Sequence, residues 1–449
     1  MTNPDLEKLI AQKDWRALNT HLSTLPPPET AEVLSNLEQS DRVLLFHMLP
    51  RSQSVESFSY LETSLQESLL TELTDEDTQQ ILTTLRPDDR TVLLEGLPRE
   101  TLSRLLRLLN PQDLQEARQL LGYPEESVGR LMTPDFVVVL PRWTIEQSLR
   151  HIRSRGQGSE TISTIYVTDE NWKLLDALEL EQFVLAQPSE TVAQIMNNTF
   201  IALSAQDDRE EAVRQMQKYD LFALPVINDH DVLLGIVTID DVFDVAEEEA
   251  TEDIQKGAAV EPLKHSYRES SIWALYLKRI PWLGALLLVN LAASGVIVMF
   301  EDTLASALAL AFFIPLLMGS GGNTGAQAAT LMVRALATED IKVSQWLTTV
   351  TKEIFVGSIL GITLGIGVGL IGYWRGEASI GLAVGLSMAA IVLASNLIGV
   401  LFPVMLTKLH VDPAVASSPM VTSTADVTSL ILYFSIATTI LRNLKETGL

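Results

Sequence analysis

The sequence of 449 residues contains no cysteine, so the chain forms no disulfide and offers no thiolate to a metal ion. Histidine is scarce as well, and the six histidines are scattered along the chain. Any metal bound by this chain is therefore a hard cation with oxygen ligands. The sequence also lacks the motifs GxxxxGK[ST], HExxH and GxSxG, which are typical of P-loop NTPases, zinc proteases and serine hydrolases. Their absence argues against an enzyme of these classes.

Basic residues are few: 32 Lys and Arg stand against 57 Asp and Glu, giving a net charge of -25 at pH 7. From Ser271 onward the chain holds nine residues of each sign, so the whole excess of negative charge lies before that point. The acidic residues before Ser271 repel the phosphates of nucleic acids, so we expect no nucleic-acid partner. Its acidity fits either ordinary solubility or cation binding. The N-terminus has no apolar run, so we expect no cleaved signal peptide.

The first segment, residues 1–125, repeats a leucine every twelve residues, and several of these leucines precede a Pro or Asp/Thr that can begin a helix. A fixed period of short helices predicts an all-α superhelical domain in which each unit buries its apolar face on the next. Such arrays are usually docking surfaces. The repeated positions are Leu25, Leu37, Leu49, Leu61, Leu73, Leu85, Leu97 and Leu109.

The second segment, residues 126–245, alternates short β-branched runs with helical patterns, which is typical of βαβ units. Strands are expected at Phe136–Val139, Thr164–Val167 and Leu233–Thr238, and helices at Thr144–Arg155 and Arg209–Tyr219. Two local patterns recur, Leu131-Met-Thr-Pro with Ile195-Met-Asn-Asn, and Leu224-Pro-Val-Ile-Asn-Asp before Leu234-Gly-Ile-Val-Thr-Ile-Asp-Asp. They resemble paired cystathionine-β-synthase (CBS) domains. The first copy departs from the pattern, with Asp176-Ala-Leu-Glu-Leu in place of a Gly-hydrophobic-hydrophobic-Ser/Thr turn.

The third segment, residues 271–449, holds five uncharged stretches that each meet the length of about twenty apolar residues needed for a membrane span. The basic loops between them favour a cytosolic position for the acidic N-terminal part. We therefore predict a multidomain integral membrane protein whose connecting helix, 246–270, leads into an α-helical domain of five spans. The stretches are Pro281–Phe300, Thr303–Val333, Ile354–Trp374, Ala378–Thr407 and Pro413–Leu441.

Asp426 is the one charged side chain in the last of these stretches and falls near its middle. A carboxylate at that depth costs several kcal/mol, roughly 2.5 or more, unless it faces water or a partner. The other apolar stretches contain no Lys, Arg or His to neutralise it. A transported cation can take that place; the alternatives are a protonated Asp or one hydrogen-bonded across helices.

The second stretch contains Pro315-Leu-Leu-Met-Gly-Ser-Gly-Gly-Asn-Thr-Gly-Ala-Gln, with four glycines in seven residues. Each glycine costs a helix about 1 kcal/mol relative to alanine, so irregular backbone lining a water-filled path is one expectation. The alternative is a regular helix that packs closely through its small residues.

Pro315–Gln327 with the following Ala-Thr-Leu-Met-Val-Arg-Ala-Leu-Ala, and Ser418-Pro-Met-Val-Thr-Ser-Thr-Ala-Asp-Val-Thr, resemble the two signatures of the MgtE family of magnesium transporters. The order of the parts matches over essentially the whole chain. The resemblance implies a homodimer in the cell (inner) membrane with the pore between subunits. It also implies a pore site for Mg²⁺ at Asp426, with Gly322, Asn323 and Ala425 beside it and Asn396 as a weaker candidate.

Mg²⁺ needs octahedral oxygen coordination at about 2.1 Å, and a carboxylate that holds the ion through its water ligands suits it. Thr422, Ser423 and Ser429 share the helical face of Asp426, where they line the same path or bond their own backbone.

The resemblance also implies regulation, in which Mg²⁺ bound to cytosolic acids closes the pore through the connecting helix, called a plug. If Ala246–Ala258 is helical, three acids share one face, and their mutual repulsion is relieved by a cation. ATP is a further expected ligand of the CBS pair. The predicted regulatory ligands are Glu249, Glu252, Asp253, Asp208, Glu210, Asp241, Asp244, Asp412, Asp88 and Asp89. The alternatives are another divalent cargo (Co²⁺ or Mn²⁺), Na⁺-coupled exchange, and a CBS-based sensor without transport.

Overall fold

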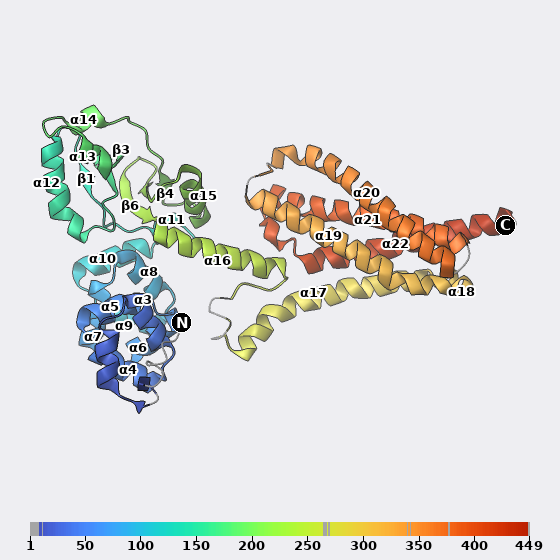
Figure 1. The fold of residues 1–449 in the computed structure, drawn as a ribbon, viewed down its shortest axis with the longest axis horizontal. Coiled ribbons are helices and arrows are strands. Elements are labelled where there is room, and N and C mark those ends of the chain that lie inside the picture. The colour runs from blue at the N-terminus through green and yellow to red at the C-terminus, as the bar shows by residue number, and fades with distance from the viewer. Residues whose placement is uncertain are drawn as a thin grey trace. The chain divides into compact units, whose positions relative to one another are not determined.

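The computed structural model describes residues 9–10, 12–263, 267, 270–338, 340–341, 343–375 and 378–447 (Figure 1). The chain forms two compact units, Met1–Glu248 and Glu249–Leu449. The first unit contains the helical repeats and the CBS pair, and the second contains the membrane helices. This agrees with the predicted class of a multidomain membrane protein.

The helical domain consists of short helices separated by two to four residues, and many of the helices begin at a Pro or at a capping side chain. Thr74 caps α7 by accepting from Asp77 N, and Asn110 caps α10 by accepting from Asp113 N. The helices are α2 (Trp15–Leu22), α3 (Pro27–Ser35), α4 (Gln39–Met48), α5 (Arg51–Ser59), α6 (Thr63–Glu72), α7 (Asp75–Thr84), α8 (Pro87–Glu95), α9 (Arg99–Leu108) and α10 (Pro111–Leu120).

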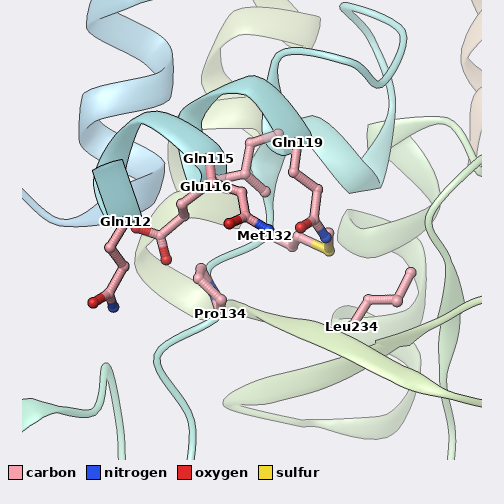
Figure 2. A pocket seen from close by; sticks show the side chains of 8 residues that line it. Gln112, Gln115, Glu116, Gln119, Met132, Pro134 and Leu234 are labelled. Atoms are coloured by element: carbon pink, nitrogen blue, oxygen red, sulfur yellow. The ribbon is translucent and has the colours of Figure 1, made fainter. Parts of the chain in front are cut away.

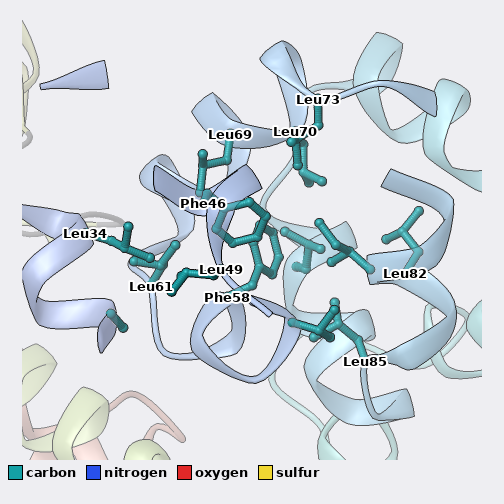
Figure 3. Close-up of a cluster of buried hydrophobic side chains, with 14 of the residues drawn as sticks. Leu34, Phe46, Leu49, Phe58, Leu61, Leu69, Leu70, Leu73, Leu82 and Leu85 are labelled. Atoms are coloured by element: carbon teal, nitrogen blue, oxygen red, sulfur yellow. The ribbon is translucent and has the colours of Figure 1, made fainter. Parts of the chain in front are cut away.

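The leucines with the twelve-residue period lie at or near the ends of these helices and point into one continuous core. Figure 3 shows the middle of that core, where Phe46 and Phe58 meet edge to face with ring centroids 6.2 Å apart. A leucine at each helix end thus joins one helix to the next and excludes water from the turn.

The structural repeat is a pair of helices, twice the period of the leucines. Every 24 residues a buried polar side chain donates back eight residues to a carbonyl near the end of the preceding helix. Arg42 Nε donates to Leu34 O at 2.9 Å, Gln66 Nε2 to Phe58 O at 2.8 Å, and Arg90 Nη1 to Leu82 O at 3.2 Å. These side chains satisfy carbonyls that have no partner inside their own helix.

The CBS pair contains two small three-stranded sheets with the same topology, each with one parallel and one antiparallel pairing. The first sheet and its helices are β1 (Val138–Val139), α12 (Ile145–Arg155), β2 (Thr164–Thr168), β3 (Leu174–Glu179) and α13 (Leu180–Leu185). The second copy has α14 (Val192–Ile195), β4 (Leu203–Ser204), α15 (Arg209–Tyr219), β5 (Ala223–Ile227), β6 (Leu233–Thr238) and α16 (Ile239–Gly257), and α11 (Val128–Leu131) precedes the pair.

The departure of the first copy at Asp176 has a local structural cause. Asp176 pairs with Val167 in the first sheet as Gly235 pairs with Val226 in the second. At Gly235 the backbone of Thr133 lies close, 2.8 Å from where a Cβ would be, so a side chain has no room. At Asp176 the buried carboxylate instead accepts hydrogen bonds from the backbone N–H of Asn197 and Asn198 at 2.8 and 2.9 Å.

Among the described residues, five helices are long and apolar enough to cross a membrane, as predicted. They are α17 (Ile272–Met299), α19 (Ile314–Ala337), which the short 3₁₀ helix η2 (Leu308–Phe313) precedes, α20 (Trp346–Arg375), α21 (Ala378–Lys408) and α22 (Ser418–Thr447). A short helix, α18 (Glu301–Ser306), follows α17, the 3₁₀ turn η3 (Val343–Gln345) precedes α20, and η4 (Pro413–Val415) precedes α22.

The expectation of irregular backbone in the glycine-rich stretch is wrong, because α19 continues as an α-helix from Ile314 to Ala337. The glycines serve the alternative, close packing. Gly321 and Gly322 are buried against side chains of α21 and α22, and a Cβ at Gly322 would lie 2.7 Å from Thr422 Cγ2. The cost of glycine in a helix is offset by contact with the neighbouring helices.

Candidate ion site and acidic clusters

Asp426 lies on α22 beside the glycine stretch of α19. A Cβ at Gly322 would be 3.7 Å from Asp426 Oδ1, so the backbone of α19 passes directly next to the carboxylate. Thr422, one turn earlier on α22, approaches Gly322 O at 3.5 Å. Asp426 is half-buried, and in the described parts of the chain no hydrogen bond or ion pair engages its carboxylate.

The other predicted pore residues differ in exposure. Gly322 and Ala425 are buried at the contact between α19 and α22, whereas Asn323 is exposed. Consecutive residues of a helix point about 100° apart, so Gly322 can face α22 while Asn323 faces outward. The structure therefore brings Asp426 and Gly322 together and directs the Asn323 side chain away from that contact.

Asn396, the weaker candidate, is buried and engaged elsewhere. Its Nδ2 donates at 2.9 Å both to the backbone O and to the Oε2 of Glu353 on α20. It thus joins α21 to α20. Of the residues that share a face with Asp426, Ser423 and Ser429 are buried, and the Ser429 hydroxyl has no hydrogen-bond partner among the described residues.

The first turns of α8 and α16 bring several acids of the first unit together. Asp88 is 5% exposed, and its Oδ1 has no partner in the described chain. Asp241 accepts a hydrogen bond from Thr238 Oγ1 at 2.8 Å. Burial raises the pKa of Asp241 to about 8, and the charge of Asp88 contributes to this. Burial likewise raises the pKa of Asp88 to about 6, with the charge of Asp89 adding to it.

Asp89 and Asp244 lie at the edge of the same group. Burial raises the pKa of Asp89, and the charges of Asp240 and Asp244 raise it further while Arg86 acts in the opposite direction. The pKa of Asp244 is raised by burial and by Glu248 and Glu247 on its own helix. We call Asp88, Asp89, Asp240, Asp241 and Asp244 the α8–α16 acid cluster. The ionised forms of Asp88, Asp89 and Asp241 are disfavoured because these carboxylates are removed from water and lie near other negative charges.

Asp208 and Glu210 have a different local setting. Asp208 is the N-cap of α15, and its Oδ1 accepts from Glu210 N at 2.9 Å; both side chains are exposed. Between them, Arg209 bonds Glu126 Oε2 and Glu248 Oε2, each at 2.8 Å. Asp208 therefore has a structural role as a cap, and Arg209 ties α15 to α16.

In the second unit, three predicted ligands gather around a lysine at the end of α16. Lys256 Nζ lies 2.7 Å from Asp412 Oδ2 and also bonds Glu252 Oε1. Burial acts to lower the pKa of Lys256, but the bonds to Asp412 and Glu252 outweigh it and raise the pKa above its ordinary value. Burial and the charge of Asp412 raise the pKa of Asp253, against the opposing effect of Lys256. Glu249, half-buried on the same helix, has interactions of its own.

Neither the α8–α16 acid cluster nor the acids around Lys256 are already arranged to coordinate a metal ion. In the part of the chain that the structure describes, no three His, Asp or Glu side chains are arranged to hold one metal ion. A cleft of about 250 Å³ lies between α10 and the CBS pair, where Gln112, Gln115, Glu116 and Gln119 face Met132, Pro134 and Leu234 (Figure 2). None of the predicted acidic ligands lines it.

The sequence analysis missed Lys256 and Asp240, which take part in these groups. The Lys256 contact had a local signal, since Glu252 and Lys256 are spaced i,i+4 on a helix. Its second partner, Asp412, is 156 residues away and has no signal in the sequence.

Five long apolar helices with a half-buried carboxylate in the last, joined to paired CBS domains and a helical repeat domain, are the architecture of a multi-pass membrane protein. Family models match in the same order: an MgtE intracellular N domain at residues 25–126, CBS domains at 128–185 and 192–248, and a divalent cation transporter, MgtE, at 314–436. The magnesium transporter MgtE of Thermus thermophilus is 38% identical over 436 residues, covering 96% of this chain and 97% of that protein. The magnesium transporter MgtE of Bacillus subtilis is 30% identical over 92% of this chain and 94% of its own length. The chain belongs to the MgtE family, which is a family of transporters and not of enzymes.

Two solved structures resemble the first part of the chain. The cytosolic domain of the Mg²⁺ channel MgtE in complex with ATP has a TM-score of 0.51 and 34% identity, covering 54% of this chain and 98% of that one. The soluble part of a magnesium transporter has a TM-score of 0.50 and 26% identity, covering 55% and 96%.

Proposed function

We propose that this protein is a homodimeric magnesium channel or transporter, in which Asp426 holds Mg²⁺ in the ion path. One observation carries the proposal: a half-buried carboxylate in a membrane helix has no partner among the described residues and lies beside the buried backbone of Gly322. The names of the relatives at 38% and 30% identity support Mg²⁺ as the cargo.

The chemistry of Mg²⁺ suits such a site. The ion sheds its water reluctantly and usually keeps several water ligands, so one carboxylate per subunit can hold it through its hydration shell. Asn323, which is exposed on α19, offers an amide oxygen to the partner subunit or to the hydrated ion. A path between two subunits places these exposed and half-buried groups away from lipid, where they are costly.

Internal Mg²⁺ closes this path by binding acids of the cytosolic domains and of the connecting helix. The α8–α16 acid cluster supports this, because its buried carboxylates repel one another and a divalent cation relieves that repulsion. A ligand shifts a conformational equilibrium only through its preference for one state, and an acid cluster that forms only when α8 meets α16 provides that preference.

The cytosol is the proposed location of the acidic unit, in a chain that spans the cell membrane. The basic residues Lys278, Arg279, Arg334 and Lys408 flank the spans on that side. ATP is the proposed second ligand of the CBS pair, supported by the related cytosolic domain solved with ATP. The first copy is the poorer candidate, since Asp176 uses its carboxylate to hold the backbone of Asn197 and Asn198 in the second copy.

The deciding experiment is Mg²⁺ influx into proteoliposomes that contain a Mg²⁺-sensitive dye, with wild type, Asp426→Asn and Asp302→Asn. Asp302 is an exposed acid on α18, so its variant controls for loss of one negative charge. We expect Asp426→Asn to lose influx and Asp302→Asn to keep it. Influx that survives in a folded, dimeric Asp426→Asn protein would refute the pore assignment.

The cargo itself is tested in the same vesicles. Oxygen ligands accept several hard divalent cations, so Co²⁺ and Mn²⁺ are the competing cargoes. Direct influx of each, measured one at a time with a metal-sensitive dye, separates a magnesium pathway from a general divalent one. Absence of flux for every cation would favour a CBS-based sensor instead.

A further inference from the structure

Lys256 joins the connecting helix to the segment that precedes the last span. Its Nζ lies 2.7 Å from Asp412 Oδ2 and bonds Glu252 Oε1 one turn earlier on α16. The three side chains are 26%, 37% and 29% exposed for Lys256, Asp412 and Glu252, so the contact is partly shielded from water. A shielded ammonium shared by two carboxylates is a stronger contact than an exposed ion pair.

The side chain of Asp412 is hydrogen-bonded to the turn at the N-terminal end of α22, the helix that contains Asp426. Its second oxygen, Oδ1, accepts from Ala414 N at 2.8 Å and caps the short turn η4, which leads directly into α22. Ala414, Ala416 and Ser417 along this turn are 2%, 3% and 0% exposed. A force on the Asp412 carboxylate therefore acts on packed backbone at the beginning of α22.

The segment after α16 is held in a second place. Leu263 N donates to Gln255 Oε1 at 2.8 Å, Glu261 N donates to Lys278 O at 3.2 Å, and Lys278 Nζ lies 3.3 Å from Glu261 Oε2. The end of α16 is thus tied both to the first span and to the turn before the last span.

Charge around Lys256 leaves room for a further cation. Lys256 Nζ contacts Glu252 and Asp412, and beside the effect of burial the charge of Asp412 raises the pKa of Asp253 while Lys256 and Arg334 act in the opposite direction. Lys256 therefore neutralises part of this negative charge and leaves an excess that a divalent cation can satisfy.

We propose that Lys256 is a permanent cation of the gate, a positioning residue that holds the connecting helix to the turn before α22 whether or not Mg²⁺ is bound. This rests on the proposed closure of the path by internal Mg²⁺. Mg²⁺ strengthens a contact that the lysine has already made, so a fraction of the molecules is closed even without the metal. Closure then needs less Mg²⁺ than it would if the carboxylates met without a counter-charge.

The test compares Mg²⁺ influx into proteoliposomes whose interior holds either no Mg²⁺ or a graded internal concentration. Lys256→Met removes the charge and keeps an unbranched side chain that is one atom shorter. Lys256→Arg keeps the charge and is the conservative variant. Lys173→Met, which breaks a 3.0 Å ion pair with Asp231 in the CBS pair, is the matched control.

Without internal Mg²⁺ we expect Lys256→Met to conduct about fivefold more than wild type, the size of a modest coupling between two sites. More internal Mg²⁺ should be needed to halve its influx. Lys256→Arg should return both values to within about twofold of wild type, and Lys173→Met should not move them. Equal influx in Lys256→Met and wild type, together with equal closure by Mg²⁺, would overturn the lysine proposal and leave Mg²⁺ gating intact. A wild type that internal Mg²⁺ does not close would instead overturn the gating proposal itself.

Discussion

The carboxylate of Asp241 in α16 lies close enough to that of Asp88 in α8 for the charge of one to raise the pKa of the other. Asp88 belongs to the helical domain and Asp241 to the CBS pair, so the two carboxylates are close only when these two domains are in contact. The ordinary pKa of aspartate is 3.8; burial and the charge of Asp88 raise it to about 8 for Asp241, and burial with the charge of Asp89 raises it to about 6 for Asp88.

The contact between α8 and α16 should weaken with rising pH in the absence of divalent cations. Each group holds its proton when the domains meet and releases it when they separate, so the stabilisation is full below about pH 4 and is lost as pH rises towards 8. Asp241→Asn should remove most of this dependence. Thermal unfolding of the full-length protein should give a lower melting temperature at pH 8 than at pH 5, and a smaller difference between the two pH values in Asp241→Asn.

The same variant tests the cluster as a cation site. Wild type should gain thermal stability from Mg²⁺ at pH 8, and Asp241→Asn should gain less, because one negative charge of the cluster is gone. Asp229→Asn, an exposed acid of the CBS pair, is the control. An equal gain in all three proteins would show that Mg²⁺ stabilises the protein elsewhere.

Gly322→Ala should impair both packing and influx. Its Cβ would lie 2.7 Å from Thr422 Cγ2, so α19 and α22 must separate, at a cost of about 1–3 kcal/mol. Thr422→Ser removes that methyl group and keeps the hydroxyl, so it should rescue Gly322→Ala. Gly319→Ala, which meets nothing within 4 Å, should behave as wild type in detergent melting and in flux.

Alanine variants of Asn396 and Asn323 should have different effects, one on thermal stability and the other on Mg²⁺ influx. Asn396→Ala leaves Glu353 without its buried donor and should destabilise the membrane domain by about 1–3 kcal/mol. Asn323→Ala removes an exposed amide and should leave the melting temperature unchanged while it lowers Mg²⁺ influx. The opposite pattern would make Asn323 the structural residue and reopen the pore assignment.

Gln66→Leu should destabilise the helical domain although it adds apolar surface to a core. The variant keeps the volume and removes the side-chain donor to Phe58 O, which retains the backbone N–H of Leu61 as a partner, so the expected cost is about 1 kcal/mol. Gln79→Leu, exposed on α7, should change the melting temperature little. If the two variants melt alike, the buried hydrogen bond has no net stabilising effect.

The helical repeats could be predicted because their signal is local. A leucine every twelve residues with Pro or Asp at helix starts gives helices of 9 or 10 residues. Their grouping into pairs of 24 residues depends on Arg42, Gln66 and Arg90, whose buried hydrogen bonds are not evident from residue type, since Arg and Gln are usually exposed.

The glycine stretch of α19 shows where local reasoning fails. Helix propensity alone argues for broken backbone, because it counts the cost of each glycine and omits what the glycine contacts. In the structure the helix persists, since Gly321 and Gly322 allow α19 to pack on α21 and α22. Propensity is a weak term when tertiary contacts act on the same residues.

The sequence by itself determined the order of the parts, the number of spans and the isolated carboxylate at Asp426, because composition, period and hydropathy act along the chain. Only the tertiary structure decided which acids gather. It brought Asp88 of α8 to Asp241 of α16, joined Lys256 to Asp412 across 156 residues, and turned Asn396 towards Glu353. Those pairings depend on how helices that are distant in sequence pack against each other. The charge of a side chain can be read from the sequence, but which distant side chain it will contact cannot, because only neighbours three or four residues apart on a helix are set by sequence spacing.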